Sequence, residues 1–152
     1  MFIKQISAFV ENRPGRIAEI TEILASHNID LRALSVADTT DFGILRIIVD
    51  RPDEVTALLR ENRVTVTLTD VLAIKLPDKP GALMNISKII ADLQGNIIKL
   101  EHNQFVSINR NSAVELVITL EAFGPEHKQL IINTLAEHGY RPKEKMTTGI
   151  YN

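Results

Sequence analysis

The stretch ENRPGRIAEI, Glu11–Ile20, contains the Pro-Gly loop that decides the fold, because it returns in altered form as PDKPGALMNI, Pro77–Ile86. Each version follows an apolar run of strand length and opens a run in which aliphatic residues recur at helical spacing. Gly15 and Gly81 stand 66 residues apart (81 − 15). A loop that recurs in the same context predicts two copies of one structural unit.

The 66-residue offset holds without a gap well beyond the loop. At this spacing, aliphatic residues of the first copy match aliphatic residues of the second through the helix and into the next strand. The matched pairs include Ile17 and Leu83, Ile20 and Ile86, Ile23 and Ile89, Leu24 and Ile90, Leu31 and Ile97, and Leu34 and Leu100. Within the helices, steps of three and four residues place these side chains on one face, which we expect to be core.

Both copies predict strand, helix, strand, strand and helix in the same order. The expected strands are Ile3–Val10, Ile29–Ala37, Ile44–Val49 and Val64–Leu68 in the first copy, and Val71–Leu76, Ile97–Val106 and Val114–Leu120 in the second. Polar turn-forming residues separate them. A last strand is expected near Tyr140–Met146, where a proline and lysines weaken the pattern.

The sequence also indicates where helices begin and end. The first helix of each copy is expected to end near Asn28 and Gly95, because both residue types tolerate the left-handed conformation that closes a helix. Pro52 and Pro125 stand where proline favours the first turn of the second helices. Gly139 closes the last helix.

This element order predicts an α+β fold of two tandem ferredoxin-like βαββαβ domains, each an antiparallel sheet with its helices on one face. We expect the domains to span residues 1–69 and 70–152. Units of roughly 70 residues have little stability to spare, so each is expected to pair with a twin. Because no flexible Gly or Ser linker lies at Thr69–Val71, the copies are expected to dock as a pseudo-dimer.

Composition argues against several function classes. A formal net charge of −2 and a pI of about 6.1 make nucleic acid and membrane surfaces unexpected partners. The chain contains no cysteine, which excludes disulfides and thiolate chemistry. Its histidines lack metal-ligand spacing, and neither a cofactor fingerprint nor a catalytic constellation is visible. We expect a protein that is not an enzyme, that needs no metal or cofactor and that, lacking a targeting signal, is cytoplasmic.

The first copy resembles the ACT domain. The resemblance rests on the loop ENRPG, the aliphatic residue two positions after its glycine, the segment NIDL and the hairpin strand DTTDFGILRIIV. The stretch is most similar to the small regulatory subunit of acetolactate synthase, although that subunit continues with an unrelated domain and this chain continues with a second copy. The resemblance implies a free-standing regulatory module whose partner is a free amino acid.

The resemblance also implies which residues contact the ligand. In amino-acid-binding members these are the loop asparagine, the glycine, and an asparagine that starts the second strand of the paired domain. Pairing of the two copies then implies two unequal sites. Site one comprises Asn12, Arg13, Pro14, Gly15, Arg16, Ile17, Asn96 and Ile97, and site two comprises Asp78, Lys79, Gly81, Ala82, Leu83, Asp30 and Leu31.

Physical chemistry supports the same role for the loops. A helix N-terminus presents unpaired N–H groups and a partial positive charge to a carboxylate, and glycine removes the Cβ that would block contact. Asn and Asp oxygens accept hydrogen bonds from an ammonium group, but Asp also repels the ligand carboxylate. We therefore expect site one to bind the amino acid, and site two to bind weakly, to prefer a cation or not to bind.

Alternatives remain for the residues and for the function. Each Pro-Gly pair also fits a plain turn that starts a helix, and the loop cations Arg13, Arg16 and Lys79 also fit solvated surface charges. Four aliphatic residues fit either a ligand pocket or the core: Ile17, Leu31, Leu83 and Ile97. The alternative function is a subunit that docks on an amino-acid biosynthetic enzyme through a sheet edge, with vestigial ligand sites. Free edges would also serve a homodimer.

Overall fold

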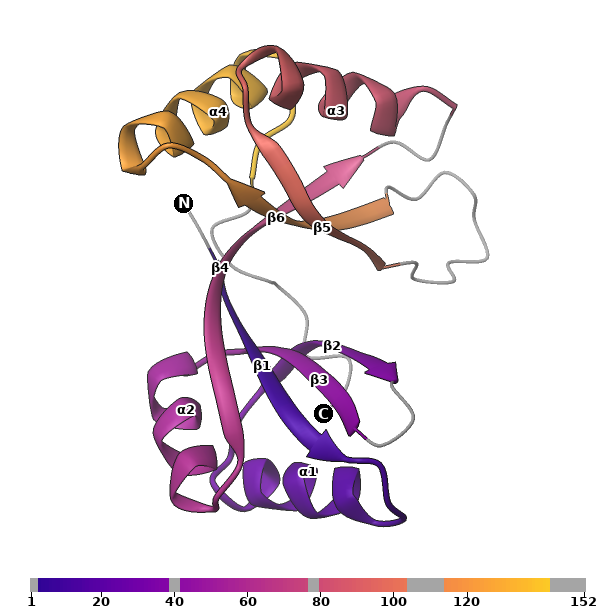
Figure 1. Cartoon of the computed structure of the whole chain (residues 1–152), viewed down its shortest axis with the longest axis vertical. Helices are drawn as coiled ribbons and strands as arrows, with labels where there is room; N and C mark the ends of the chain where they lie inside the picture. Colours follow the sequence, from indigo (N-terminus) through magenta and orange to yellow (C-terminus); the bar gives the residue numbers. More distant parts are fainter. Residues whose placement is uncertain (1–2, 39–41, 77–79, 104–113, 143–152) are drawn as a thin grey trace. The chain divides into compact units, whose positions relative to one another are not determined.

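The computed structural model describes residues 3–38, 42–76, 80–103 and 114–142 (Figure 1). Along the chain the elements are β1 Ile3–Glu11, α1 Arg16–Ser26, β2 Leu31–Asp38, β3 Phe42–Val49, α2 Pro52–Glu61, β4 Thr65–Leu76, α3 Ala82–Asp92, β5 Asn96–Asn103, β6 Val114–Glu121 and α4 Pro125–Glu137. The predicted order of strands and helices is therefore present twice. Within the described residues, no helix has the length and apolar character needed to cross a bilayer.

The chain divides into two compact units. Of the described residues, 4–70 form the N-terminal unit, and residue 3 with 71–142 forms the C-terminal unit. The hydrogen-bonded strand order is β2-β3-β1-β4 in the N-terminal unit and β4-β6-β5 in the C-terminal unit. β3 is antiparallel to β1 and β2, and β6 is antiparallel to β4 and β5. The predicted α+β, ferredoxin-like class is confirmed.

β4 is continuous where the sequence predicts two strands, Val64–Leu68 and Val71–Leu76. It runs for 12 residues from Thr65 to Leu76. The residues between the predicted strands include neither glycine nor proline, and β-branched threonine favours extended backbone. The last strand of the first copy and the first strand of the second are therefore one element.

Both cores use the same alternation along β4. Val66 and Leu68 pack with the N-terminal core, whereas Leu72, Ile74 and Leu76 belong to the C-terminal core. All five residues occupy even-numbered positions, and successive side chains of a strand point to opposite faces. The register of each half of β4 is thus set by the core of its own unit.

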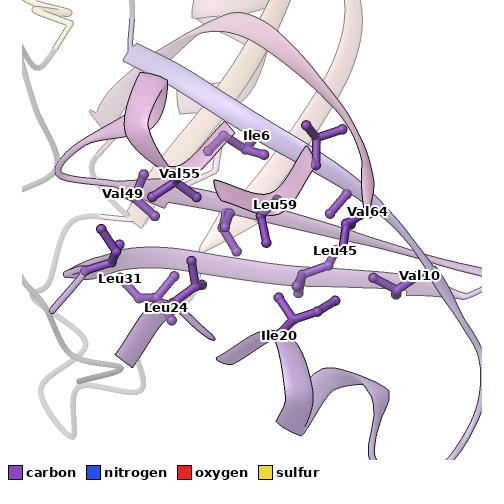
Figure 2. Packing of buried hydrophobic residues seen from close by; sticks show 14 residues of the cluster. Ile6, Val10, Ile20, Leu24, Leu31, Leu45, Val49, Val55, Leu59 and Val64 are labelled. Atoms are coloured by element: carbon purple, nitrogen blue, oxygen red, sulfur yellow. The ribbon is translucent and has the colours of Figure 1, made fainter. Parts of the chain in front are cut away.

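The N-terminal core combines side chains from β1 to β4 with side chains from α1 and α2 (Figure 2). Ile6 and Val10 come from β1 and Leu45 from β3, and they pack with the inner face of α1. On that face Ile20 and Leu24 are 0% and 1% exposed, as their helical spacing predicts. Each such side chain contributes about 1.5–3 kcal/mol by its burial.

The C-terminal core repeats this arrangement at the 66-residue offset. Ile86 and Ile90 of α3, the counterparts of Ile20 and Leu24, are 0% and 1% exposed. They pack with residues of β4 and β6 and with Ile131 on α4. The sequence repeat therefore corresponds to a repeat of packing.

Each of the four helices in the described residues ends in the same hydrogen-bonded turn. After α1, Asn28 adopts a φ of 55°, and the N–H of Ile29 donates to the carbonyl of Leu24 at 3.0 Å. A left-handed residue and the same backward bond also follow α2, α3 and α4, with the left-handed residue at Arg63, Gln94 and Gly139. This is the Schellman motif, which satisfies carbonyl groups that a helix end leaves unpaired.

The left-handed residue after α3 is Gln94, so the prediction of that role for Gly95 is wrong by one position. Gly95 is needed for space instead. A Cβ built there would lie 2.8 Å from Cδ1 of Ile131 and 2.9 Å from Cγ2 of Ile90, both of which belong to buried core residues. The counterpart of Gly95 in the first copy is the buried Ile29.

Some expectations concern residues outside the described ranges. These are the second strand beyond Asn103, the loop residues Asp78 and Lys79, and the last strand from residue 143 onward. The described part of that last strand contributes one antiparallel bridge, between Ile74 and Pro142.

Candidate binding loops

Gly15 and Gly81 have the same backbone conformation at the N-termini of α1 and α3. Their φ angles are 84° and 90°, in the left-handed region that favours glycine. Each carbonyl accepts the first backbone bond of its helix, from the N–H of Glu19 at 2.9 Å and of Asn85 at 3.0 Å. A Cβ at either glycine would meet no atom within 4 Å. The conformation requires glycine, and the space beside it is open.

Among the residues that the structure describes, no side chain caps either of these helix starts. The N–H groups of a first turn have no partner within the helix, and they lie at the positive end of the helix dipole. Asn12, just before the Pro-Gly pair of α1, is exposed, and its amide has no hydrogen bond within the described part of the chain. This arrangement suits a small ligand that carries a carboxylate.

The two arginines of the first loop are paired inside the loop. Arg13 donates to both carboxylate oxygens of Glu19 at 3.1 and 3.0 Å and to Glu11 at 3.1 Å, and Arg16 donates to Glu19 at 3.0 Å. The pKa of Glu19 is lowered, mainly by the hydrogen bonds from Arg13 and to a lesser extent by the one from Arg16. The pKa of Arg13 is raised, mainly by its hydrogen bonds to Glu19 and to a lesser extent by the one to Glu11. Both cations are therefore largely neutralised by neighbouring carboxylates.

One donor of this cluster has no acceptor. The side chain of Arg16 is only 16% exposed, and its Nε is buried without a hydrogen-bond partner among the described residues. An unsatisfied buried donor costs about 1–3 kcal/mol. A ligand carboxylate that reached this nitrogen would remove that cost.

Glu19→Gln is expected to weaken the loop in a pH-dependent way. Because the folded-state pKa of Glu19 lies below its ordinary value of 4.5, the ion pairs stabilise the fold above that value. The stabilisation is lost as the pH falls through the folded-state pKa. Wild type should therefore lose its advantage over Glu19→Gln on acidification, measured by urea denaturation at neutral and acidic pH. Added salt should reduce the difference, because the pairs are exposed.

Glu22→Gln is the control for that prediction. Glu22 is also exposed on α1, and no ion pair or hydrogen bond of its side chain is found among the described residues. The free energy of unfolding of Glu22→Gln should therefore change with acidification as that of wild type does. If Glu19→Gln did the same, the ion pairs of Glu19 with Arg13 and Arg16 would contribute nothing to stability.

The aliphatic candidates divide between surface and core. Ile17 and Leu83, each two residues after its glycine, are 42% and 43% exposed. Leu31 is buried in the N-terminal core, and Ile97 is half-buried against the C-terminal core. Ile17 and Leu83 are therefore available to a ligand at the loops, whereas Leu31 and Ile97 chiefly support the strands.

Asp30, at the start of β2, is already engaged. Its Oδ2 accepts from Nε of Arg32 at 3.3 Å, and its N–H donates to Oδ1 of Asp50 at 3.1 Å. Arg32 lies at a register shift between Leu31 and Ala33 in the β2–β3 ladder. Sequence reasoning missed Arg32, although residues two apart on a strand share a face and the spacing Asp-Leu-Arg signals such a pair.

Asn96, the counterpart of Asp30, is not engaged in this way. The β5–β6 ladder has the same register shift, but the residue there is the exposed Ile98 and not an arginine. The side chain of Asn96 is exposed and has no hydrogen bond to any described residue. The starts of β2 and β5 thus share a register shift, but Asp30 is charged and paired with Arg32, whereas Asn96 is neutral and open to a ligand.

Each unit holds its glycine loop and its second-strand start at opposite ends of its sheet. In the N-terminal unit, β3 pairs Phe42 with Glu11 beside the loop and pairs Val49 with Leu31 at the start of β2. At about 3.3 Å per residue, these two ends of β3 are roughly 23 Å apart. A single small ligand cannot reach both, so Asn12 and Asp30 are not brought together within this unit.

The C-terminal unit has the same separation. β6 pairs Val114 with Leu76, which leads into the second glycine loop, and pairs Glu121 with Asn96. Gly81 and Asn96 therefore lie at opposite ends of their sheet as well. Neither unit therefore brings its own glycine loop and its own second-strand start into one small-ligand site. Among the described residues, no cluster of three or more His, Asp or Glu side chains could hold a metal ion.

Two aspartate kinase subunits share the fold of this chain. The regulatory subunit from Thermus thermophilus, in its ligand-free form, has a TM-score of 0.62 and 15% identity, with coverage of 89% of this chain and 91% of its own. The regulatory subunit from Thermus flavus has a TM-score of 0.60 and 12% identity, with coverage of 90% and 93%. No protein in the curated set matches the chain.

Two further comparisons identify the family. Protein BT0572 from Bacteroides thetaiotaomicron is 34% identical, with coverage of 94% of this chain and 92% of its own, and its structure has a TM-score of 0.79. A family model described as an ACT domain pair matches residues 1–106, more than half of the chain. This chain therefore belongs to the ACT domain pair family.

Proposed function

We propose that this protein is a non-catalytic regulatory module that binds a free amino acid where the glycine loop of one unit meets the second-strand start of another. Membership of the ACT domain pair family supports the regulatory role. The observation that carries the site is the pair of open, left-handed glycine helix starts at Gly15 and Gly81. The separation of loop and strand start within each unit supports a composite site.

Each group of a zwitterion has a partner in the proposed site one. The carboxylate lies at the N-terminus of α1, where it accepts from backbone N–H groups and from the unpartnered Nε of Arg16. The ammonium donates to the amide oxygens of Asn12 and Asn96, both of which are exposed and unengaged among the described residues. The ligand side chain lies against Ile17.

Site two is proposed to bind more weakly. Its strand residue, Asp30, is neutralised by Arg32, so it is a poorer acceptor for an ammonium group. Its loop offers Gly81 and the exposed Leu83, while Ala82 is buried. The loop residue Asp78 adds a negative charge where site one has the neutral Asn12, and this charge opposes a carboxylate.

A thermal-shift screen of the standard protein amino acids tests this function. A ligand that binds only the folded chain must raise the melting temperature. Asn12→Ala should reduce affinity for the responding amino acid by about tenfold to a hundredfold, the usual effect of losing a hydrogen bond to a charged group. Asp78→Ala, at the equivalent position of the second loop, should leave that affinity unchanged. Equal losses for both variants, or none for Asn12→Ala, would contradict the assignment.

The second candidate function is docking on an amino-acid biosynthetic enzyme, with the loops vestigial. It is favoured by the fold shared over nearly the full chain with two aspartate kinase regulatory subunits. A panel without any thermal shift, together with capture of such an enzyme by the full-length chain, would favour this candidate over the sensor.

A further inference from the structure

A pocket with a volume of about 250 Å³ opens on the helix side of the C-terminal unit. Its lining residues are Asn85, Lys88, Ile89 and Asp92 of α3, and His138 and Tyr140, which follow α4. All of them belong to one unit, and none belongs to either loop site. The pocket is therefore distinct from both loop sites.

Two rigid features position the lining. Asn85, Ile89 and Asp92 follow one another on α3 in steps of four and three residues, which places them along one helix face. The turn that ends α4 is fixed by Gly139, with a φ of 88°, and by the bond from the N–H of Tyr140 to the carbonyl of Leu135 at 2.8 Å. Backbone hydrogen bonds thus hold both the α3 face and the turn after α4 in place.

The charged groups of the pocket have no partner in the described structure. Lys88 and Asp92 are four residues apart on α3, a spacing that often gives an ion pair. No ion pair or side-chain hydrogen bond of either residue is found among the described residues. One cation and one anion are therefore both available to a ligand.

Three further lining groups offer neutral hydrogen bonds. Nδ1 of His138 lies 2.8 Å from the carbonyl of Thr134, which can only accept, so Nδ1 carries the proton and Nε2 of the neutral ring is an acceptor. The hydroxyl of Tyr140 and the side-chain amide of Asn85 have no hydrogen bond within the described part of the chain. Ile89 adds an apolar surface between the polar groups.

We propose that this pocket is a further ligand site, separate from sites one and two, which takes a small zwitterion such as a free amino acid. Lys88 binds the carboxylate, and Asp92 with Nε2 of His138 accepts from the ammonium. A simple anion would face Asp92 and a simple cation would face Lys88, so only a ligand with both charges is favoured by both residues. The volume suits a metabolite smaller than the drug-sized ligands of typical pockets.

The first copy shows that the fold itself does not require this set. At the 66-residue offset, the α3 residues that line the pocket correspond to Glu19, Glu22, Ile23 and Ser26. No lysine stands among them, and the hydroxyl of Ser26 donates to the carbonyl of Ile23 at 2.8 Å. The combination of a cation, Lys88, and an anion, Asp92, beside the pocket is therefore a property of the C-terminal unit.

NMR titration of the full-length chain tests the proposal. Backbone amides of Lys88 and Asp92 should shift on addition of at least one standard protein amino acid, whereas acetate and methylammonium, which carry one charge each, should shift them far less. Lys88→Met and Asp92→Asn should each weaken this titration about tenfold or more, since each removes a charge-assisted hydrogen bond. Circular dichroism verifies that both variants fold.

The loop sites provide the internal control. Asn12→Ala should leave the titration at Lys88 and Asp92 unchanged, and Lys88→Met should leave any response of the Gly15 amide unchanged. A loss of ligand binding at the loop site would thus be measured separately from a loss of binding at the pocket. The proposal is overturned if no amino acid shifts the two α3 amides, if acetate shifts them as strongly as an amino acid, or if both charge variants titrate like wild type.

Discussion

Replacing Ile20 by alanine is expected to reduce the free energy of unfolding by about 2–5 kcal/mol. Ile20 is 0% exposed and packs in the N-terminal core between α1 and the sheet. Truncation removes its buried methyl and methylene groups and leaves a cavity that the surrounding strands cannot fill completely. Urea denaturation followed by circular dichroism measures the loss.

The same helix and the repeat both offer controls for this variant. Ile17→Ala, one turn earlier on α1 and 42% exposed, should change stability by at most about 0.5 kcal/mol. Ile86→Ala, at the equivalent fully buried position of α3, should give a loss of the same size as Ile20→Ala. A loss below about 1 kcal/mol for Ile20→Ala would show that this position is not core.

Gly95→Ala is expected to destabilise the C-terminal unit by about 1–3 kcal/mol through overpacking. The added Cβ would lie 2.8 Å from Cδ1 of Ile131 and 2.9 Å from Cγ2 of Ile90. Both contacts are too close for carbon atoms, and both isoleucines are buried, so neither side chain can move into solvent. Thermal or urea denaturation measures the change.

Ile131→Val provides the test of mechanism, because valine lacks the Cδ1 methyl that the new Cβ would meet. Alone, it should cost about 0.5–1.5 kcal/mol. Combined with Gly95→Ala, it should relieve the clash, so the double variant should be more stable than the two single losses added together. Strict additivity would assign the effect of Gly95→Ala to something other than contact with Ile131.

Much of the fold could be predicted from the sequence, because the two copies support one another. The offset between Gly15 and Gly81 aligns two helices whose inner faces are buried at matching positions, Ile20 with Ile86. The same offset aligns the two left-handed helix ends at Asn28 and Gln94. At Ile20 and Ile86 the residue pattern and the repeat agree, whereas at the second helix end the residue pattern favours Gly95 and the repeat favours Gln94.

Other features depend on contacts that are distant in sequence. In the sequence Gly95 indicates a helix end, but glycine is needed at this position because the side chain of Ile131, on another helix, leaves no space for a Cβ. The continuity of β4 could not be predicted, because strand-like residues on both sides of Asp70 fit one strand or two. The secondary-structure propensity of single residues does not predict contacts between distant parts of the chain.

The candidate sites were predictable only in part. The glycine loops were visible as motifs, and their left-handed backbone follows from residue type. The spacing of two residues signals the pairing of Asp30 with Arg32, but no local pattern predicts the register shift at which Arg32 lies. The pocket beside Lys88 and Asp92 needs the end of α4, which lies far along the chain.

The alternation of β4 restricts how sequences of this kind can change length. Val66 and Leu72 serve different cores from positions of the same parity, with no loop between them to absorb an insertion. Within Leu72–Leu76, adding or deleting one residue would turn the apolar side chains beyond that point away from the C-terminal core unless a bulge compensated. Among related chains, length differences within either half of β4 should therefore come in twos.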